Sequence, residues 1–345
     1  MSLGGGVWVT QDKRLPGSYI NFVNSTTATG SLGERGIVAI ALTLGKAAGE
    51  VIEITKADFI DKCEDMLGIK IDSPEATPLR EIFRHAVKVL IYDLGTDGAV
   101  ADAVKALEPY EFNVLCAYTS ESTDTEAYIA AVQSWRDEYG KKCQVVVYNS
   151  DADHEGVINV VSTVKGDEVD AYALTAWVAG AEAGCKLNES CTNMLYDGEY
   201  TVVTDKTQAE LEEYLNTGKL AFHLVYGDVR VLEDINSLVS TTDEKGEDFK
   251  YNQTIRVIDQ IANDIAKLFN TKYLGKIPNN ASGRVSLWGD IVAHHRELEK
   301  IQAIEAFDSS MLTVEQGATK KSIVVNDAVT VTNAMAQLYM TVVVR

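Results

Sequence analysis

Few residues of this 345-residue chain have types and spacing suited to catalysis or metal binding. The segment that carries Asp151, Asp153, His154 and Glu155 places three carboxylates beside an imidazole, a ligand set that divalent metals accept. A solvated turn after a strand explains the same four residues. We favour the turn, so the sequence predicts no metal site here.

Two adjacent histidines, His294 and His295, fall within a predicted helix. Neighbouring helical residues point about 100° apart, so the two rings are not expected to share one metal. We expect His294 to be exposed and His295 to be a partly buried core residue.

Two acidic groups have the composition of paired acids in general acid–base catalysis. They are Asp228, Glu233 and Asp234, followed by Asp243, Glu244, Glu247 and Asp248. Charge runs are usually solvated faces, and we interpret these as such. The phosphate-binding patterns G-x-x-x-x-G-K-[ST] and G-x-G-x-x-G and the nucleophile pattern G-x-S-x-G do not occur. We therefore predict no catalytic residue, no cofactor-binding residue and no cofactor.

The five cysteines form no C-x-x-C pair, and their number is odd. This usage is typical of buried thiols in a reducing cytoplasm. The nearest pair, Cys185 and Cys191, would need further ligands from elsewhere to bind a metal, and packing is the simpler interpretation.

Composition excludes several classes of function. The chain carries 31 Lys+Arg against 51 Asp+Glu, a net charge of −20, which argues against general nucleic-acid binding and anionic membrane surfaces. A hydrophobic fraction of 46% predicts a sizeable core, and the length suggests two or three domains. We find no membrane-spanning run and expect no secretory signal peptide at the N-terminus.

Apolar periodicity predicts alternating strands and helices, as in an α/β layer. The expected strands are 36–42, 87–94, 112–118, 144–148, 157–161, 200–203, 220–226 and 229–232. The expected helices begin at Thr55 and Pro78 and span 96–108, 122–138, 166–184 and 208–215. A long helix capped by Asn252 and a second over 287–307 follow, and then strands at 322–325, 328–332 and 339–344. The β-prone segments 18–22 and 339–344 have no neighbouring strand to pair with, so each needs a distant partner or another chain.

Several segments resemble the tail sheath proteins of contractile phage tails. They are residues 4–8 and 15–22, the run GDVRVLEDINSL at 227–238, residues 252–280 with YLGKIPN, Gly283-Arg284, and 334–344. Residues 190–192 and 196–198 resemble the middle domain of that family. The resemblance is to the branch of Gram-positive myophages, defective prophages and phage-tail-like bacteriocins.

The resemblance implies a mixed α/β (α+β) protein with two compact domains and two extended arms. It places an N-terminal arm at 1–23, an outer or middle domain at 24–219, an inner domain at 220–330 and a C-terminal arm at 331–345. In this family the arms add strands to the sheets of neighbouring subunits. The implied N-terminal arm residues are Trp8, Tyr19, Ile20 and Phe22, and the implied C-terminal ones are Tyr339, Thr341, Val342, Val343 and Val344.

The function implied is structural and not enzymatic. Such a subunit polymerises as stacked hexameric rings around a tail tube, contracts from a metastable extended state, and meets tube, baseplate and tail terminator proteins. It would assemble in the bacterial cytoplasm, without direct membrane or nucleic-acid binding, and leave with the particle on lysis. The alternatives are a cytoplasmic α/β enzyme of unidentified reaction and another sheath, such as that of a type VI secretion system.

Charge is unevenly divided along the chain. Residues 1–219 hold 18 Lys+Arg and 35 Asp+Glu (net −17), and residues 220–345 hold 13 and 16 (net −3). The stretch 250–300 holds 8 and 5 (net +3). Because the family places its C-terminal domain against the tube, the candidate tube-facing residues are Lys267, Lys272, Lys276 and Arg284, unless these are scattered surface cations.

Overall fold

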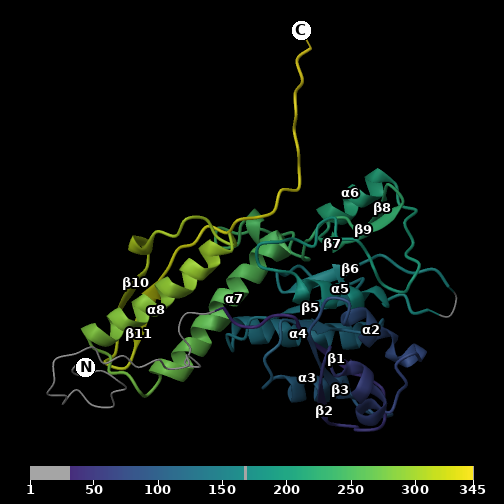
Figure 1. Ribbon diagram of the computed structural model, residues 1–345, viewed down its shortest axis with the longest axis horizontal. Coiled ribbons are helices and arrows are strands. Elements are labelled where there is room, and N and C mark those ends of the chain that lie inside the picture. The colour runs from purple at the N-terminus through teal and green to yellow at the C-terminus, as the bar shows by residue number, and fades with distance from the viewer. Residues whose placement is uncertain (1–31, 167–168, 345) are drawn as a thin grey trace, which may run out of the picture.

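A seven-stranded sheet organises one side of the molecule in the computed structural model, which describes residues 32–166 and 169–344 (Figure 1). Its strand order is β2-β3-β1-β4-β5-β6-β7. The strands are β1 (Ile37–Leu42), β2 (Val51–Thr55), β3 (Lys88–Asp93), β4 (Val114–Cys116), β5 (Gln144–Tyr148), β6 (Val157–Val160) and β7 (Lys219–Leu220). Only β2 is antiparallel to its neighbour, as expected where helices connect the strands.

Alternate residues of the central strands supply two different cores. In β1, Val38 and Ile40 belong to one apolar cluster, while Ala39 and Ala41 belong to another on the opposite face. Because successive side chains on a strand point to opposite faces, a continuous apolar run indicates burial on both sides. The sheet is therefore an inner layer with helices above and below it.

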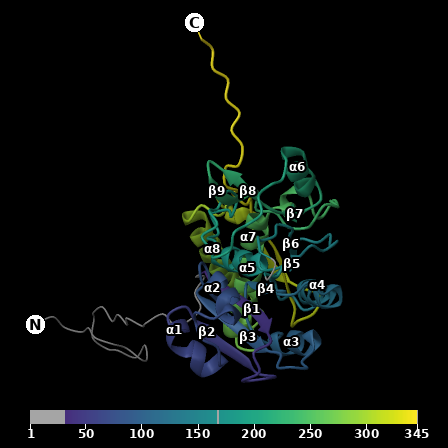
Figure 2. The same ribbon diagram turned by 90° about the vertical axis from the view of Figure 1, so that its right-hand side faces the viewer.

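The helices divide between the two faces of the sheet (Figures 1 and 2). Those of the first face are α1 (Phe59–Lys62), α2 (Thr77–Ile82) and α5 (Leu174–Gly184), and those of the second are α3 (Val100–Leu107) and α4 (Ser122–Asp137). Short π- and 3₁₀-turns at Cys63–Leu67 and Pro74–Ala76 lead into α2. A Cβ on Gly180 would lie 2.4 Å from the backbone oxygen of Ile82, so α5 approaches α2 closely.

Two elements extend the sheet domain at its β7 side. Helix α6 (Gln208–Asn216) begins with a capping box between Thr207 and Glu210. The hairpin of β8 (Phe222–Val225) and β9 (Asp228–Val231) follows β7 and adds apolar side chains to the first core.

A second body is formed by two long helices and a small hairpin. Helices α7 (Asn252–Leu268) and α8 (Ala281–Lys300) pack around a third apolar cluster, which includes Val257, Leu287 and Ile291. A 3₁₀-turn (Glu247–Lys250) precedes α7, and a π-turn, η4 (Phe269–Tyr273), extends it. The hairpin of β10 (Thr313–Gln316) and β11 (Ile323–Asn326) lies beside α8, after the 3₁₀-turn Ser309–Met311 (Figure 1).

The mixed α/β class is confirmed, and most expected elements occur near their predicted positions. The helix predicted to begin at Thr55 is wrong, because Val51–Thr55 is β2 and α1 begins at Phe59. In β2 the buried Ile52 and Ile54 alternate with exposed Glu53, which is the period of a half-buried strand. Strands β2 and β10 were not predicted.

The predicted bounds of α7 and α8 need correction. Asn252 is the first residue of α7, and Tyr251 occupies the cap position. Helix α8 starts earlier than predicted, because the Asn280 side chain accepts a hydrogen bond from the Gly283 amide. It ends at Lys300, and Gln302 then adopts a positive φ of 62°, so Ile304 joins the core from beyond the helix.

Three predicted C-terminal or middle strands are not strands within the described chain. Residues 200–203 and 328–332 contribute one isolated bridge each, Val164 to Val202 and Ile304 to Val331. Residues 339–344 are extended without a strand partner. β-propensity alone does not make a strand where no sheet edge lies alongside. The predicted N-terminal arm, 1–23, lies outside the described residues.

Candidate assembly site

The C-terminal segment, residues 334–344, projects from the body as a single extended chain (Figures 1 and 2). Its apolar side chains face solvent: Tyr339 is 88% exposed and Val344 is 90% exposed. Thr341, Val342 and Val343, the other predicted arm residues, are exposed as well. Contiguous apolar surface of this kind usually marks a binding region.

The root of this segment is held firmly to the start of α7. The Gln253 side chain accepts a hydrogen bond from the Ala334 amide at 2.9 Å and donates one to the Thr332 carbonyl at 3.2 Å. The Thr254 hydroxyl donates to the Asn333 side chain at 3.2 Å. The chain is therefore anchored up to Ala334 and leaves the body beyond it.

The β10–β11 hairpin has two open edges within the described chain. Its two strands pair only with each other, from Thr313 with Asn326 to Gln316 with Ile323. Val324 and Val325 are exposed. An open edge presents unpaired N–H and C=O groups, so the hairpin can accept a further strand.

The four candidate tube-facing cations each contact other groups of the chain. Lys267 reaches back to the sheet domain and pairs with Glu111 at 2.9 Å. Lys272 pairs with Asp290 at 2.6 Å, between η4 and α8. Lys276 and Arg284 lie in the turn after η4 and the first turn of α8, where they donate to the Thr271 carbonyl and the Asn279 side chain. Beside them, a hollow of about 100 Å³ lies between Leu274, Ile277, Arg284 and Lys321, among other residues.

The polar face of α7 attaches the second body to the sheet domain. Asp259 binds the Arg136 guanidinium through two hydrogen bonds of 2.6 and 2.9 Å, and both side chains are largely buried. One turn further along α7, the Asn263 side chain accepts from the Lys142 amide and donates to the Lys142 carbonyl. These contacts were missed in the sequence, although Asp259 and Asn263 are spaced one turn apart on one helix face.

A fully buried charge cluster lies near the start of α7. The Arg256 guanidinium contacts Glu182 at 2.6 Å and Asp234 at 3.2 Å, and Cys191 lies beside it. One guanidinium faces two carboxylates. Burial and then Asp234 raise the pKa of Glu182 well above its usual range. Asp234, predicted to be part of a solvated face, is buried here and also accepts the Cys191 amide. All five cysteines are buried free thiols, as predicted.

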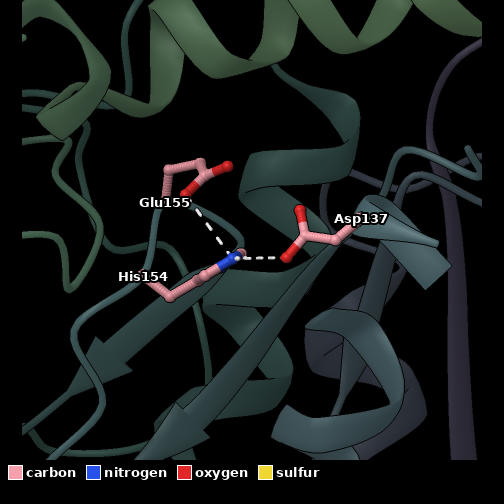
Figure 3. A group of neighbouring side chains, drawn as sticks. All are labelled: Asp137, His154 and Glu155. Carbon is pink, nitrogen blue, oxygen red and sulfur yellow. Dashed lines mark ion pairs between the residues drawn. The ribbon is translucent and has the colours of Figure 1, made fainter. Parts of the chain in front are cut away.

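The predicted acidic loop is divided by the fold. Asp153 turns away to accept the Val239 and Ser240 amides, while His154 and Glu155 meet Asp137 at the end of α4 (Figure 3). The His154 Nε2 lies 3.7 Å from an Asp137 oxygen and 3.6 Å from a Glu155 oxygen. Burial, more than any other effect, lowers the pKa of His154 below its ordinary value.

The hydrogen bonding of His154 places a hydrogen, and not a free lone pair, on Nε2, the ring nitrogen that faces the two carboxylates. The Gly156 amide donates to Nδ1 at 2.9 Å, so Nδ1 is an acceptor and the ring proton resides on Nε2. A metal at Nε2 would need the lone pair that this proton occupies. Lys245 also pairs with Glu155 at 2.8 Å, which supplies a positive charge to the group.

The prediction that His294 is exposed is wrong, whereas His295 is a core residue as predicted and is fully buried. His294 is 1% exposed and His295 is 0% exposed. Their Nδ1 atoms lie 3.3 Å apart, because the two rings turn toward each other across the helix surface despite the 100° between their positions. The rings thus form a buried pair.

None of the helices in the described ranges combines the length and apolar character needed to cross a membrane.

The described residues thus form an α/β body with an exposed, extended C-terminal segment and a hairpin whose two edges are open. Two family models match the chain: "Phage tail sheath protein central domain" over residues 95–237 and "Phage tail sheath C-terminal domain" over residues 244–345. The chain therefore belongs to the phage tail sheath proteins.

Individual relatives agree with this family. The tail sheath protein of Clostridium phage phiCD119 is 29% identical over 293 residues, which cover 83% of this chain and 81% of the relative. The crystal structure of the sheath tail protein of Desulfitobacterium hafniense superposes with a TM-score of 0.75 at 28% identity, covering 87% of this chain and 93% of that one.

The fold is also shared with a more distant assembly. The helical sheath of the anti-feeding prophage in its contracted state superposes with a TM-score of 0.72 at 15% identity, over 97% of this chain and 99% of that one. The chain matches only 58% and 57% of the length of two further relatives, both from Bacillus subtilis (strain 168).

Proposed function

We propose that this chain is the subunit of a contractile tail sheath. In this proposal it polymerises as stacked hexameric rings around a tail tube and contracts from a metastable extended state to drive the tube through a target envelope. The observation that carries the proposal is the exposed apolar segment 334–344 on a firmly anchored root, in a chain of the sheath family. The alternative of an enzyme has no assembled catalytic group in the described residues to favour it.

The C-terminal segment acts as a strand donor to a neighbouring subunit. Six residues, 339–344, can form roughly five backbone hydrogen bonds, each contributing about 0.5–1.5 kcal/mol net. Burial of Tyr339, Val342 and Val344 would add about 1.5–3 kcal/mol each. The open edges of β10 and β11 are the acceptor that fits, because they lie free beside α8 in the described chain.

The partners proposed are further copies of the chain, a tube protein, and the baseplate and terminator proteins at the two ends of the tail. The particle assembles in the bacterial cytoplasm and is released on lysis. Lys267, Lys272, Lys276 and Arg284 are the proposed tube contacts. Lys276 and Arg284 are the stronger candidates, because neither has a carboxylate partner among the described residues. Glu111 and Asp290 already pair with Lys267 and Lys272.

Electron microscopy of negatively stained, purified protein tests the donor role. Deleting 340–345 should leave a monomer with an unchanged circular dichroism spectrum, since the described part of this segment packs against nothing, and should abolish helical tubes. Ile60→Ser, which removes an exposed apolar residue of α1, is the matched control and should assemble. Normal tubes after the deletion would exclude the donor role.

The tube contact is tested separately. Lys272→Glu with Lys276→Glu should prevent sheath assembly on purified tubes. Lys62→Glu with Lys105→Glu makes the same charge change on α1 and α3 and should leave assembly intact. Decorated tubes from the first variant would assign the tube contact to another surface.

A further inference from the structure

Four buried or partly buried side chains form a continuous row through the second body. Asp264 of α7 contacts Nε2 of His294 at 3.0 Å, the two histidines meet through their Nδ1 atoms at 3.3 Å, and Nε2 of His295 contacts Asp327 at 2.7 Å. Both imidazoles are inaccessible to solvent. Neither the strand-donor role nor the tube contact uses this row.

The row joins two distant parts of the chain. The Asp264 carboxylate also accepts the Gly33 amide at 3.0 Å, just before β1. Asp327 directly follows β11, on the segment that continues to the anchored root at Thr332 and Ala334. The two histidines on α8 therefore lie between the chain that enters the sheet domain and the chain that leaves the second body.

The number of protons in the row follows from its donors and acceptors. A carboxylate only accepts, so the Nε2 atoms of His294 and His295 must both carry hydrogen. Asp264 also accepts from the Gly33 amide and the Gln260 amide group, which suits the ionised form that only accepts, and a site remains for the His294 N–H. Between the two Nδ1 atoms, one nitrogen must donate and the other accept. Two rings with three N–H groups amount to one imidazole and one imidazolium.

We propose that His294 and His295 form a proton-binding site that holds a single shared proton, and that this proton locks the segment at Gly33 to the segment at Asp327. If all four ring nitrogens carry hydrogen, both rings are cations, and two N–H groups point at each other across the 3.3 Å between the Nδ1 atoms. Loss of the third proton leaves two lone pairs facing each other. Either change removes the central hydrogen bond of the row.

The surrounding charges favour one proton over none or two. Two carboxylates, Asp264 and Asp327, face the rings, so the row has a net charge of −1 with the shared proton in place. The cations nearby lie one contact further out: Arg35 donates to Gln260, and Lys267 on α7 pairs with Glu111. The Phe307 ring packs on His295 with their centroids 4.7 Å apart, and the Arg296 guanidinium lies over that ring. Asp290, also on α8, forms an ion pair with Lys272.

Linkage gives the sign of the pH dependence. In acid, the unfolded or opened chain binds one more proton than the closed row, so the row loosens as pH falls. In alkali, the closed row binds one more proton than the opened chain, so the row loosens as pH rises. One proton of difference changes the opening equilibrium by up to tenfold per pH unit on each side. The lock is therefore tightest at an intermediate pH and loosens on either side of it.

Nitrogen NMR of the full chain labelled with ¹⁵N-histidine counts the protons directly. The expected result near neutral pH is three protonated nitrogens on the two buried rings. Two or four protonated nitrogens would overturn the proposal, and this measurement needs no variant. The proton count does not depend on sheath assembly, so it stands or falls separately from the proposed function.

Hydrogen exchange measured by mass spectrometry tests the lock. Peptides covering residues 33–36 and 328–333 should show a maximum of protection at an intermediate pH, with a fall on both sides. His294→Gln keeps a donor toward Asp264 but removes the nitrogen that faces His295, so the maximum should disappear. His223→Gln, on the half-buried β8 strand, is the control and should retain it. A maximum that persists unchanged in His294→Gln would overturn the lock.

Discussion

The ion pair between Arg136 and Asp259 should contribute strongly to the attachment of α7 to the sheet domain. Replacing Asp259 by Ala leaves a guanidinium that is 2% exposed. Among the described residues, its remaining partners are the Cys143 carbonyl at 2.8 Å and Glu155 at 3.9 Å. Removing one partner of a buried pair costs about 3–5 kcal/mol. The two remaining partners of Arg136 place the expected loss near the lower limit, about 3 kcal/mol.

Urea unfolding of the monomeric chain, followed by tryptophan fluorescence, measures this loss. With a slope of about 2–3 kcal/mol per molar urea, the midpoint should fall by about 1 M. Glu111→Ala is the control, because it breaks the Lys267–Glu111 pair, whose side chains are 57% and 77% exposed. Such exposed pairs contribute under about 1 kcal/mol.

A double variant separates the pair itself from the penalty of an unpaired charge. Arg136→Met with Asp259→Leu removes both charges, and stability should recover most of the loss, since apolar replacements of buried pairs are often neutral. A loss in Asp259→Ala no larger than that of Glu111→Ala would refute the reasoning. So would a double variant less stable than Asp259→Ala.

Three further predictions concern the body of the molecule. Burial opposes the shift, but four backbone N–H groups hold the pKa of Asp93 below its usual range. The ionised carboxylate therefore stabilises the fold above the unfolded carboxyl pKa, and this stabilisation is lost as pH falls through the folded pKa. Asp93→Asn should make stability less dependent on pH between pH 5 and 2, as followed by circular dichroism, and an unchanged acid unfolding curve would contradict this. Because burial and Asp234 raise the pKa of Glu182, Glu182→Gln should change the thermal midpoint little at pH 7. Asp234→Asn should lower the midpoint clearly, because it leaves the Arg256 guanidinium without a charged acceptor. Equal effects of the two variants would argue against a protonated Glu182. Gly180→Ala should lower the free energy of unfolding, measured by calorimetry, by about 1–3 kcal/mol, because its Cβ would lie 2.4 Å from a backbone oxygen of α2. In the control Gly289→Ala, on α8, the added Cβ meets nothing within 4 Å, so this variant should be neutral or stabilising. Similar results for both variants would show that α5 can move.

Local patterns determine much of this fold. The double-sided apolar run of β1, with Val38 and Ile40 on one face and Ala39 and Ala41 on the other, predicts a covered sheet without knowledge of its neighbours. The stripe from Ile255 to Leu268 predicts α7 in the same way. Where the local pattern was weak or short, as in β2 and β10, the elements were missed.

The C-terminal segment illustrates a different limit. The β-prone residues Tyr339 to Val344 predict a strand, yet they are extended and unpaired in the single chain. A strand needs backbone partners, and sequence can specify the donor while the acceptor edge lies elsewhere. Local sequence therefore does not identify the partner of this segment.

The sequence by itself determined the α/β class, the family and the composition of the arms, because periodicity, motifs and propensity are local properties of the chain. Only the tertiary structure decided which polar groups meet. Arg136 and Asp259 are 123 positions apart, and Asp264 and Asp327 reach the two histidines from α7 and from beyond β11. Burial makes such pairings strong and selective, since an unpaired charge there is costly, but nothing in the local sequence names the partner. Residues that looked like a solvated face or an isolated histidine acquired their chemistry from distant segments.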